Sequence, residues 1–276
     1  MRLHGIDFTS RPRKAKPITI ASGSLTRSTL AIDTRYRLED FSAFEKWLAH
    51  AGPWLAAFDF PFALPREFVV AQEWPTRGID VWRRITETVA ALPLDDLRSR
   101  AKAYCDARAA GEKFAHRATD RVAGSSPSMK WVNPPVLYML HAGAPRLLAS
   151  GVDIPGLHAG DPKRIALEGY PGMLARRITK APYKSDEKAK QTPARAEARR
   201  EIIGALLTGD HPLAITVEPA GAILAEMQDD ASGDMLDAVL CAVQAAWAWK
   251  RRTHNYGLPV KVDPVEGWIV SCDAGE

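Results

Sequence analysis

One helix constrains the fold of this chain more than any other feature. Residues 233–249 read GDMLDAVLCAVQAAWAW, and a helix over this stretch would be apolar on nearly every side. Such a helix is typically buried. Residues three apart lie on one helix face, so Asp234 and Asp237 share a face with slim side chains such as Cys241 and Ala245. We therefore expect this helix to pack closely on another element along the face that carries its acids.

The two acids at the start of this helix have two interpretations. Asp234 as the N-cap and Asp237 in the first turn would both stabilise the helix start, because carboxylates accept hydrogen bonds from its free N–H groups and favour its dipole. Capping is the commoner role and would suffice for the helix taken alone. Asp237 nevertheless lies one turn inside the helix, where capping explains it less well. The remaining acids of the chain bear on whether this pair serves a site.

Composition limits the class of protein without selecting a function. A chain of 276 residues with 46% hydrophobic content can bury its core as one large domain or as one domain with an insertion. Its formal net charge of +4 permits a polyanionic partner such as nucleic acid but does not require one. Three scattered cysteines favour a reduced, cytoplasmic protein. The sequence shows neither an apolar signal core nor an apolar run of about 18 residues, so we expect neither secretion nor a membrane span.

The order of predicted elements is typical of an α/β domain. β-branched residues between polar breaks predict three strands, and a helix and a fourth strand follow. The fourth strand is a continuous apolar run, as expected for a strand covered on both faces. From residue 61 to about residue 161 the pattern is largely helical, which we interpret as an insertion within a single domain over residues 1–276. The predicted strands cover residues 2–8, 17–22, 28–36, 54–60, 164–168 and 266–272, and the predicted helices include one between residues 40 and 52 and one that begins at Thr192-Pro193.

Two further acids stand near the ends of predicted strands. Asp7 ends the first strand in HGIDFTS, and Asp59 ends a later strand in AAFDFPF. An ionised carboxylate among apolar residues needs a cation, a hydrogen-bond donor or solvent, and ligand chemistry in open α/β sheets collects at the carboxyl ends of strands. Each acid alone is equally well explained as a turn-forming Asp. Together with the Asp234 and Asp237 pair, however, they predict four convergent carboxylates, the ligands that Mg²⁺ and Mn²⁺ prefer.

Several motifs resemble a known family. GIDFTS, AFDFPF, SSPSMKWVNPPVLYML, ALEGYPG and DMLDAVLCA are similar to motifs of an uncharacterised bacterial family of predicted RNase H-like nucleases, related to RuvC-type resolvases. The resemblance covers nearly the whole chain. It implies an RNase H-like mixed sheet flanked by helices, with Mg²⁺ or Mn²⁺ as the cofactor and nucleic acid as the partner.

The same resemblance implies roles for five acids. It makes Asp7, Asp59, Asp234 and Asp237 metal ligands in the catalytic site, and it adds Glu168, before Tyr-Pro, as a further ligand or base. The other interpretation of Glu168 is a salt bridge with a nearby arginine. Oligomeric state stays open, with a homodimer as one alternative.

Cations near the SSPSMKW loop are candidates for substrate binding. Arg117, Arg121 and Lys130 flank this loop and could hold a phosphate, although ordinary solvated surface charge explains each of them as well. A basic stretch from Arg176 to Lys190, with Tyr183 interleaved, could follow a nucleic-acid backbone. The seven histidines have no metal-ligand spacing, so the sequence does not predict a zinc site.

These observations favour a divalent-metal-dependent nuclease in which water is the nucleophile. An ATP-dependent phosphotransferase of actin-like fold is a second hypothesis, because GIDFTS resembles the first phosphate loop of that fold. Phe8 weakens it, since that loop normally has a glycine just after the acid. A non-catalytic nucleic-acid-binding or scaffold protein is the third hypothesis.

Overall fold

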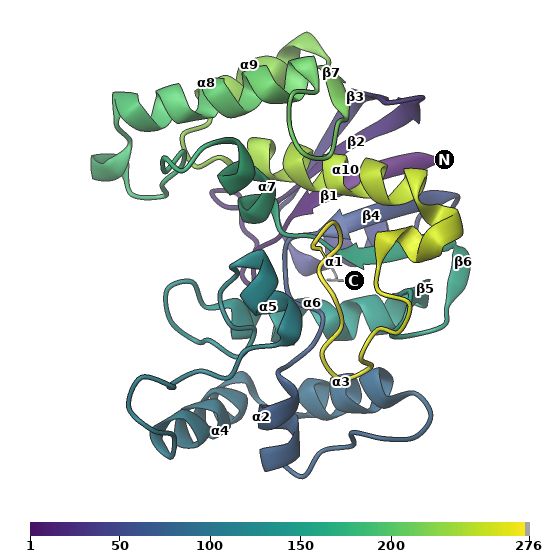
Figure 1. Cartoon of the computed structure of the whole chain (residues 1–276), viewed down its shortest axis with the longest axis vertical. Helices are drawn as coiled ribbons and strands as arrows, with labels where there is room; N and C mark the ends of the chain where they lie inside the picture. Colours follow the sequence, from purple (N-terminus) through teal and green to yellow (C-terminus); the bar gives the residue numbers. More distant parts are fainter. Residues whose placement is uncertain (274–276) are drawn as a thin grey trace.

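The computed structural model describes residues 1–273, and within them the chain forms an α/β fold around one mixed sheet (Figure 1). The first three strands form an antiparallel meander, and the other strands join it by parallel pairing. The sheet order is β5-β6-β4-β1-β2-β3-β7. The strands are β1 (Arg2–Asp7), β2 (Ile18–Thr26), β3 (Thr29–Leu38), β4 (Trp54–Phe58), β5 (Val152–Asp153), β6 (Asp161–Glu168) and β7 (Thr216–Pro219).

Helices cover both faces of the sheet and bury a separate apolar core on each. One core contains α7 to α10, and the other contains α1 together with helices from the segment between β4 and β6. The helices are α1 (Phe41–Leu48), α2 (Arg66–Ala71), α3 (Val81–Ala91), α4 (Leu94–Asp106), α5 (Ala118–Ala123), α6 (Val136–Ser150), α7 (Pro171–Ile178), α8 (Pro193–Thr208), α9 (Gly221–Asp229) and α10 (Asp234–Lys250). None of these helices within residues 1–273 is long and apolar enough to cross a membrane.

The helix α10 lies directly on the backbone of the central strand β1, as the slim side chains on its acidic face predict. Gly5 makes this approach possible. A Cβ atom at Gly5 would lie 2.0 Å from both the Ala238 carbonyl oxygen and the Ala242 backbone nitrogen. The close contact therefore requires glycine on the strand and small residues on the helix.

Two predicted elements need correction, whereas a third is confirmed. The strand predicted over residues 266–272 is wrong: this segment makes only an isolated bridge between Ile269 and Glu168. Gly267 and Ser271 have φ of +65° and +63°, which breaks an extended conformation. The largely helical stretch also ends in a short strand, β5, that the pattern did not indicate. The helix start at Thr192 is confirmed, because its side chain accepts a hydrogen bond from the Arg195 backbone N–H.

Candidate metal centre

Asp7 and Asp59 meet because β1 and β4 are adjacent parallel strands. Ile6 pairs with Phe58, so the two acids are opposite each other one residue further on. The Asp59 backbone N–H donates to the Ile6 carbonyl oxygen at 2.9 Å, which extends the pairing to this point. Side chains alternate between the faces of a strand. Both carboxylates therefore point to the sheet face that carries Gly5 and α10.

The start of α10 brings in a third acid. Gly233 is the N-cap, so the interpretation of Asp234 as the cap is wrong. The Asp230 carboxylate serves the helix start instead, and it accepts hydrogen bonds from the backbone N–H groups of Asp234 at 3.0 Å and Met235 at 3.4 Å. Asp234 and Asp237 are therefore free of side-chain capping bonds to the helix.

Three carboxylates form a compact group. Asp7, Asp59 and Asp237 each offer an oxygen atom, and these atoms lie within 4.8 Å of one another. Asp237 is fully buried, Asp7 is 7% exposed and Asp59 is partly exposed. Three convergent carboxylates without a nitrogen or sulfur ligand match the preference of Mg²⁺ and Mn²⁺ for oxygen. These three residues could hold a divalent ion.

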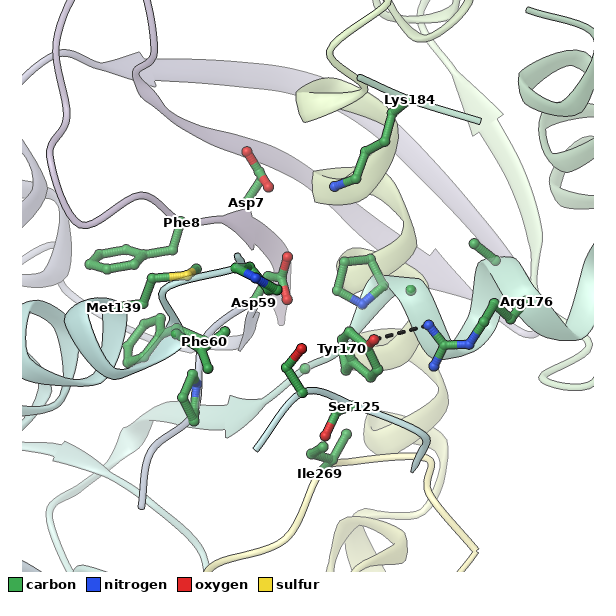
Figure 2. A pocket seen from close by; sticks show the side chains of 18 of the residues that line it. Asp7, Phe8, Asp59, Phe60, Ser125, Met139, Tyr170, Arg176, Lys184 and Ile269 are labelled. Carbon is green, nitrogen blue, oxygen red and sulfur yellow. Dashed lines mark hydrogen bonds between the residues drawn. The ribbon is translucent and has the colours of Figure 1, made fainter. Parts of the chain in front are cut away.

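Two neighbouring side chains fix the orientation of Asp237. The Tyr183 hydroxyl donates to one carboxylate oxygen at 2.5 Å, and the Lys184 ammonium group pairs with the other. In Figure 2 Lys184 points toward the acids from above. Sequence reasoning placed Tyr183 only as an aromatic residue within a basic stretch. Its role, and that of Lys184, depends on the path of a segment without regular secondary structure.

The structure does not bring Asp234 into the three-acid group. Its carboxylate pairs with the Lys16 ammonium group at 2.7 Å, and Lys16 also contacts Asp186 at 2.8 Å. Asp234 is 5% exposed, so this ion pair is largely shielded from solvent. Asp234 still acts on the group through its charge, because it contributes to the raised pKa of Asp7.

Glu168 lines the same cavity as Asp7 and Asp59 but stands outside the three-acid group. It pairs with Phe58 on β4, one residue before Asp59, and a shift of one residue reverses the face of a strand side chain. The Arg117 guanidinium group binds Glu168 through two hydrogen bonds of 2.6 and 2.8 Å. The Phe62 backbone N–H adds a third at 2.9 Å. Glu168 thus forms a buried salt bridge with an arginine, which is the alternative to a metal ligand that the sequence left open.

The acids carry unbalanced negative charge. Burial, followed by the charges of Asp234 and Asp237, raises the pKa of Asp7 well above its ordinary value. Burial and the charge of Asp237 raise the pKa of Asp59 to about 7. Burial also raises the pKa of Asp237, although Lys184 opposes this shift. Protons or a further cation would relieve the repulsion between these groups, so the charges as well as the ligand atoms fit a metal ion.

A cavity of about 630 Å³ opens beside Asp7 and Asp59. Of the three cations predicted to bind substrate, only Arg117 lines it, and its guanidinium group is occupied by Asp120 and Glu168. Arg121 and Lys130 do not line it; the Lys130 ammonium group donates to the Asn133 carbonyl oxygen at 2.5 Å. The other cations that line this cavity are Lys16, Arg176, Lys180 and Lys184.

Comparison of the chain with protein-family models, with curated proteins and with solved structures found no match. The resemblance to predicted RNase H-like nucleases therefore stays a prediction from the sequence motifs. The functional argument rests on the geometry and the charges of the site.

Proposed function

We propose that this protein is a divalent-metal-dependent nuclease of the RNase H-like type, which hydrolyses phosphodiester bonds of nucleic acid. The convergence of Asp7, Asp59 and Asp237 within 4.8 Å beside a cavity carries this proposal. The motif resemblance described above, which includes the same acids, also supports it. When bound by these acids, Mg²⁺ or Mn²⁺ would lower the pKa of a coordinated water and polarise a phosphoryl oxygen.

The surrounding residues supply orientation and positive charge. The Tyr183 hydroxyl and the Lys184 ammonium group hold the carboxylate of Asp237 in one position. Lys16 lines the cavity and neutralises Asp234, which leaves the other acids to form the three-carboxylate group. Cations at the cavity wall favour a phosphate-bearing ligand, because charge-assisted hydrogen bonds to phosphate are strong.

Water is the nucleophile that this site favours. Among the residues that the structure describes, no histidine or cysteine lines the cavity. A hydroxyl there would thus lack the histidine base that commonly activates such nucleophiles. Phe8 also weighs against the phosphotransferase hypothesis. It is 4% exposed and its ring packs on Phe60 with 4.5 Å between the ring centroids, at a sequence position where that phosphate loop normally has a glycine.

The test is cleavage of a substrate panel by the purified protein. We expect labelled single-stranded, double-stranded and branched DNA and RNA to include a substrate that is cut in Mg²⁺ or Mn²⁺ but not in EDTA. Asp7→Asn should lower the rate by at least a hundredfold because it removes a carboxylate of the group. Asp106→Asn, at an exposed acid on α4, is the matched control and should retain full activity.

Two outcomes would contradict the proposal. Cleavage that persists in Asp7→Asn would come from another protein in the preparation. A complete absence of cleavage, together with nucleic-acid binding that is unchanged in Asp7→Asn and Asp237→Asn, would favour the non-catalytic binding protein. Sedimentation of the purified protein tests the homodimer that the sequence leaves open, and a monomer in solution would rule it out.

A further inference from the structure

The cavity beside the acids has two chemically different parts. One wall is apolar and comes from the start of α6 and from Phe60, with Pro135, Val136 and Met139 partly exposed on it. Figure 2 shows Met139 and Phe60 on one side of Asp59, and Tyr170 with Arg176 on the other. A ligand between these walls would contact carboxylates at one end and apolar or aromatic surface along its sides.

Tyr170 is held rigidly on its side of the cavity. Its hydroxyl accepts a hydrogen bond of 2.9 Å from Arg176, and the Arg176 guanidinium lies 5.1 Å from the ring centroid. The Tyr170 backbone N–H donates to the Gln244 side-chain oxygen at 2.9 Å, and Gln244 in turn donates to the Ser271 hydroxyl at 3.0 Å. Arg176 thus holds the ring of this partly exposed residue, and Gln244 holds its backbone. A side chain held in this way is a prepared stacking surface, because little conformational freedom is lost when a ligand binds.

A basic turn stands next to the same cavity. The loop between β1 and β2 lines it through Thr9, Ser10 and Lys16. Arg13 and Lys16 exchange two backbone hydrogen bonds of 3.1 and 2.9 Å, which form a tight turn. This basic turn, residues 11–16, also exposes Arg11 and Lys14.

The basic turn has unbalanced positive charge. Within residues 1–273, no acidic group lies within 4.0 Å of the side-chain nitrogens of Arg11, Arg13 or Lys14. Exposed cations without acidic partners are suited to the phosphates of a nucleic-acid backbone.

The depth of the acids distinguishes between forms of nucleic acid. Asp7 and Asp237 are 7% and 0% exposed, so a phosphodiester must come into the cavity to reach them. In a duplex the bases are paired and stacked, and a base must leave the stack to enter a protein pocket. A single strand enters without this cost, and its bases can stack on aromatic side chains while cations follow its backbone. The cavity volume of about 630 Å³ lies within the range of roughly 300–1,000 Å³ typical of ligand pockets.

We infer that this site takes single-stranded nucleic acid, with an unpaired base against Tyr170 in the cavity and the adjoining phosphates along the basic turn. This inference rests on the proposed nuclease function and names its substrate class. It assigns Tyr170 as a residue that binds the base, and Arg13 and Lys14 as residues that bind phosphates. The shared chemistry of DNA and RNA leaves the sugar for the experiment to decide.

The test is fluorescence anisotropy in EDTA, which measures binding without cleavage. The probes are one labelled sequence as single-stranded DNA, as single-stranded RNA and as a blunt DNA duplex. We expect at least one single strand to bind at least tenfold more tightly than the duplex. Tyr170→Ala should weaken this binding by about 5-fold to 150-fold, which corresponds to the roughly 1–3 kcal/mol of one stacked base. Tyr170→Phe keeps the ring and should stay within about threefold of wild type.

The basic turn has its own readout. Each of Arg13→Ala and Lys14→Ala should weaken binding to single strands and reduce the slope of log affinity against log salt by about 0.7, the value for one phosphate contact. Lys102→Ala, at an exposed cation on α4, is the matched control and should change neither quantity.

Several results would overturn this inference: duplex binding as tight as single-strand binding, wild-type affinity in Tyr170→Ala, or an unchanged salt slope in both turn variants. Metal-dependent cleavage of duplex DNA alone would overturn it and leave the nuclease function standing. Conversely, single-strand binding that depends on Tyr170, without cleavage in any metal, would refute only the nuclease function.

Discussion

Asp59→Asn tests whether the three-acid group lacks a cation. Burial, followed by the charge of Asp237, raises the pKa of Asp59 from 3.8 to about 7. An acid with a raised pKa in the folded state holds its proton there while the unfolded chain releases it. Folding stability therefore falls as pH rises from about 4 to about 7. Asparagine has nearly the same shape and does not ionise, so the variant escapes this loss.

The size of the effect follows from the shift. A difference of about three pKa units corresponds to roughly 4 kcal/mol at 1.36 kcal/mol per unit. This value is an upper bound, because Asp59 is partly exposed and solvent screens its charge. We expect the free energy of unfolding of Asp59→Asn to gain about 1–3 kcal/mol on wild type between pH 4.5 and pH 8.0 in EDTA.

Urea unfolding at the two pH values provides the measurement. Asp106→Asn on α4 is the matched control, since its carboxylate is exposed, and it should track wild type at both pH values. Saturating Mn²⁺ at pH 8.0 should stabilise wild type more than the variant, because wild type then gains a ligand that the variant binds weakly. If Asp59→Asn and wild type differ by the same amount at pH 4.5 and pH 8.0 in EDTA, the argument that this group needs a cation is wrong.

Three further predictions concern the same region. Gly5→Ala should cost at least about 3 kcal/mol or prevent folding, since its Cβ would lie 2.0 Å from two backbone atoms of α10. Gly204→Ala has open space around it and should stabilise α8 by about 0.5–1 kcal/mol in the same urea assay. Equal stability of the two variants would contradict the packing argument. Mg²⁺ or Mn²⁺ at a hundred times its Kd should stabilise wild type by about 2.7 kcal/mol in a thermal shift assay, and a similar shift in Asp237→Asn would place the ion elsewhere. Glu168→Gln should retain that metal-dependent shift because Arg117 holds Glu168 outside the three-acid group, and loss of the shift would restore Glu168 as a ligand.

The sequence predicted the fold and the site best where an acidic residue stands within or at the end of an element with a clear apolar pattern. The apolar stretch of α10 predicted both its burial and its close packing, and the strand ends at Asp7 and Asp59 predicted where two acids would meet. These predictions needed only the periodicity of one element and the rule that parallel strands end at the same edge. The mixed sheet is confirmed for the same reason, because each predicted early strand is a short run of β-branched or apolar residues between polar or turn-forming breaks.

Pairing register explains what the sequence did not reveal about Glu168. Its strand was predicted correctly, but the face of its side chain depends on which residue of β4 it opposes. Phe58 opposes Glu168, so the side chain follows the face of Phe58, where Arg117 binds it, and stays outside the three-acid group. A single sequence carries no signal for this offset, and a shift of one residue would have placed Glu168 on the other face.

The sequence pattern did not identify the residues that pair with the acids, because these residues lie in segments without helical or strand periodicity. Lys16, Tyr183 and Lys184 lie outside helices and strands, so no pattern places them beside particular acids. Arg117 shows the converse error: a cation beside a loop was expected at the surface, yet it is 1% exposed between two acids. Partner choice in such segments depends on the folded path of the chain, which the local sequence does not specify.

The charge balance of the site connects these observations. Four carboxylates, those of Asp7, Asp59, Asp234 and Asp237, face the ammonium groups of Lys16 and Lys184. Two negative charges remain if all four acids are ionised, not counting Asp186, a largely exposed acid that shares Lys16 with Asp234. The raised pKa values of Asp7 and Asp59 show one way to remove them, by retaining protons. A single divalent ion would remove them equally well, so protons and metal must compete for the same oxygens. The site therefore favours metal at alkaline pH and protons at acidic pH, which is why one substitution at Asp59 probes both.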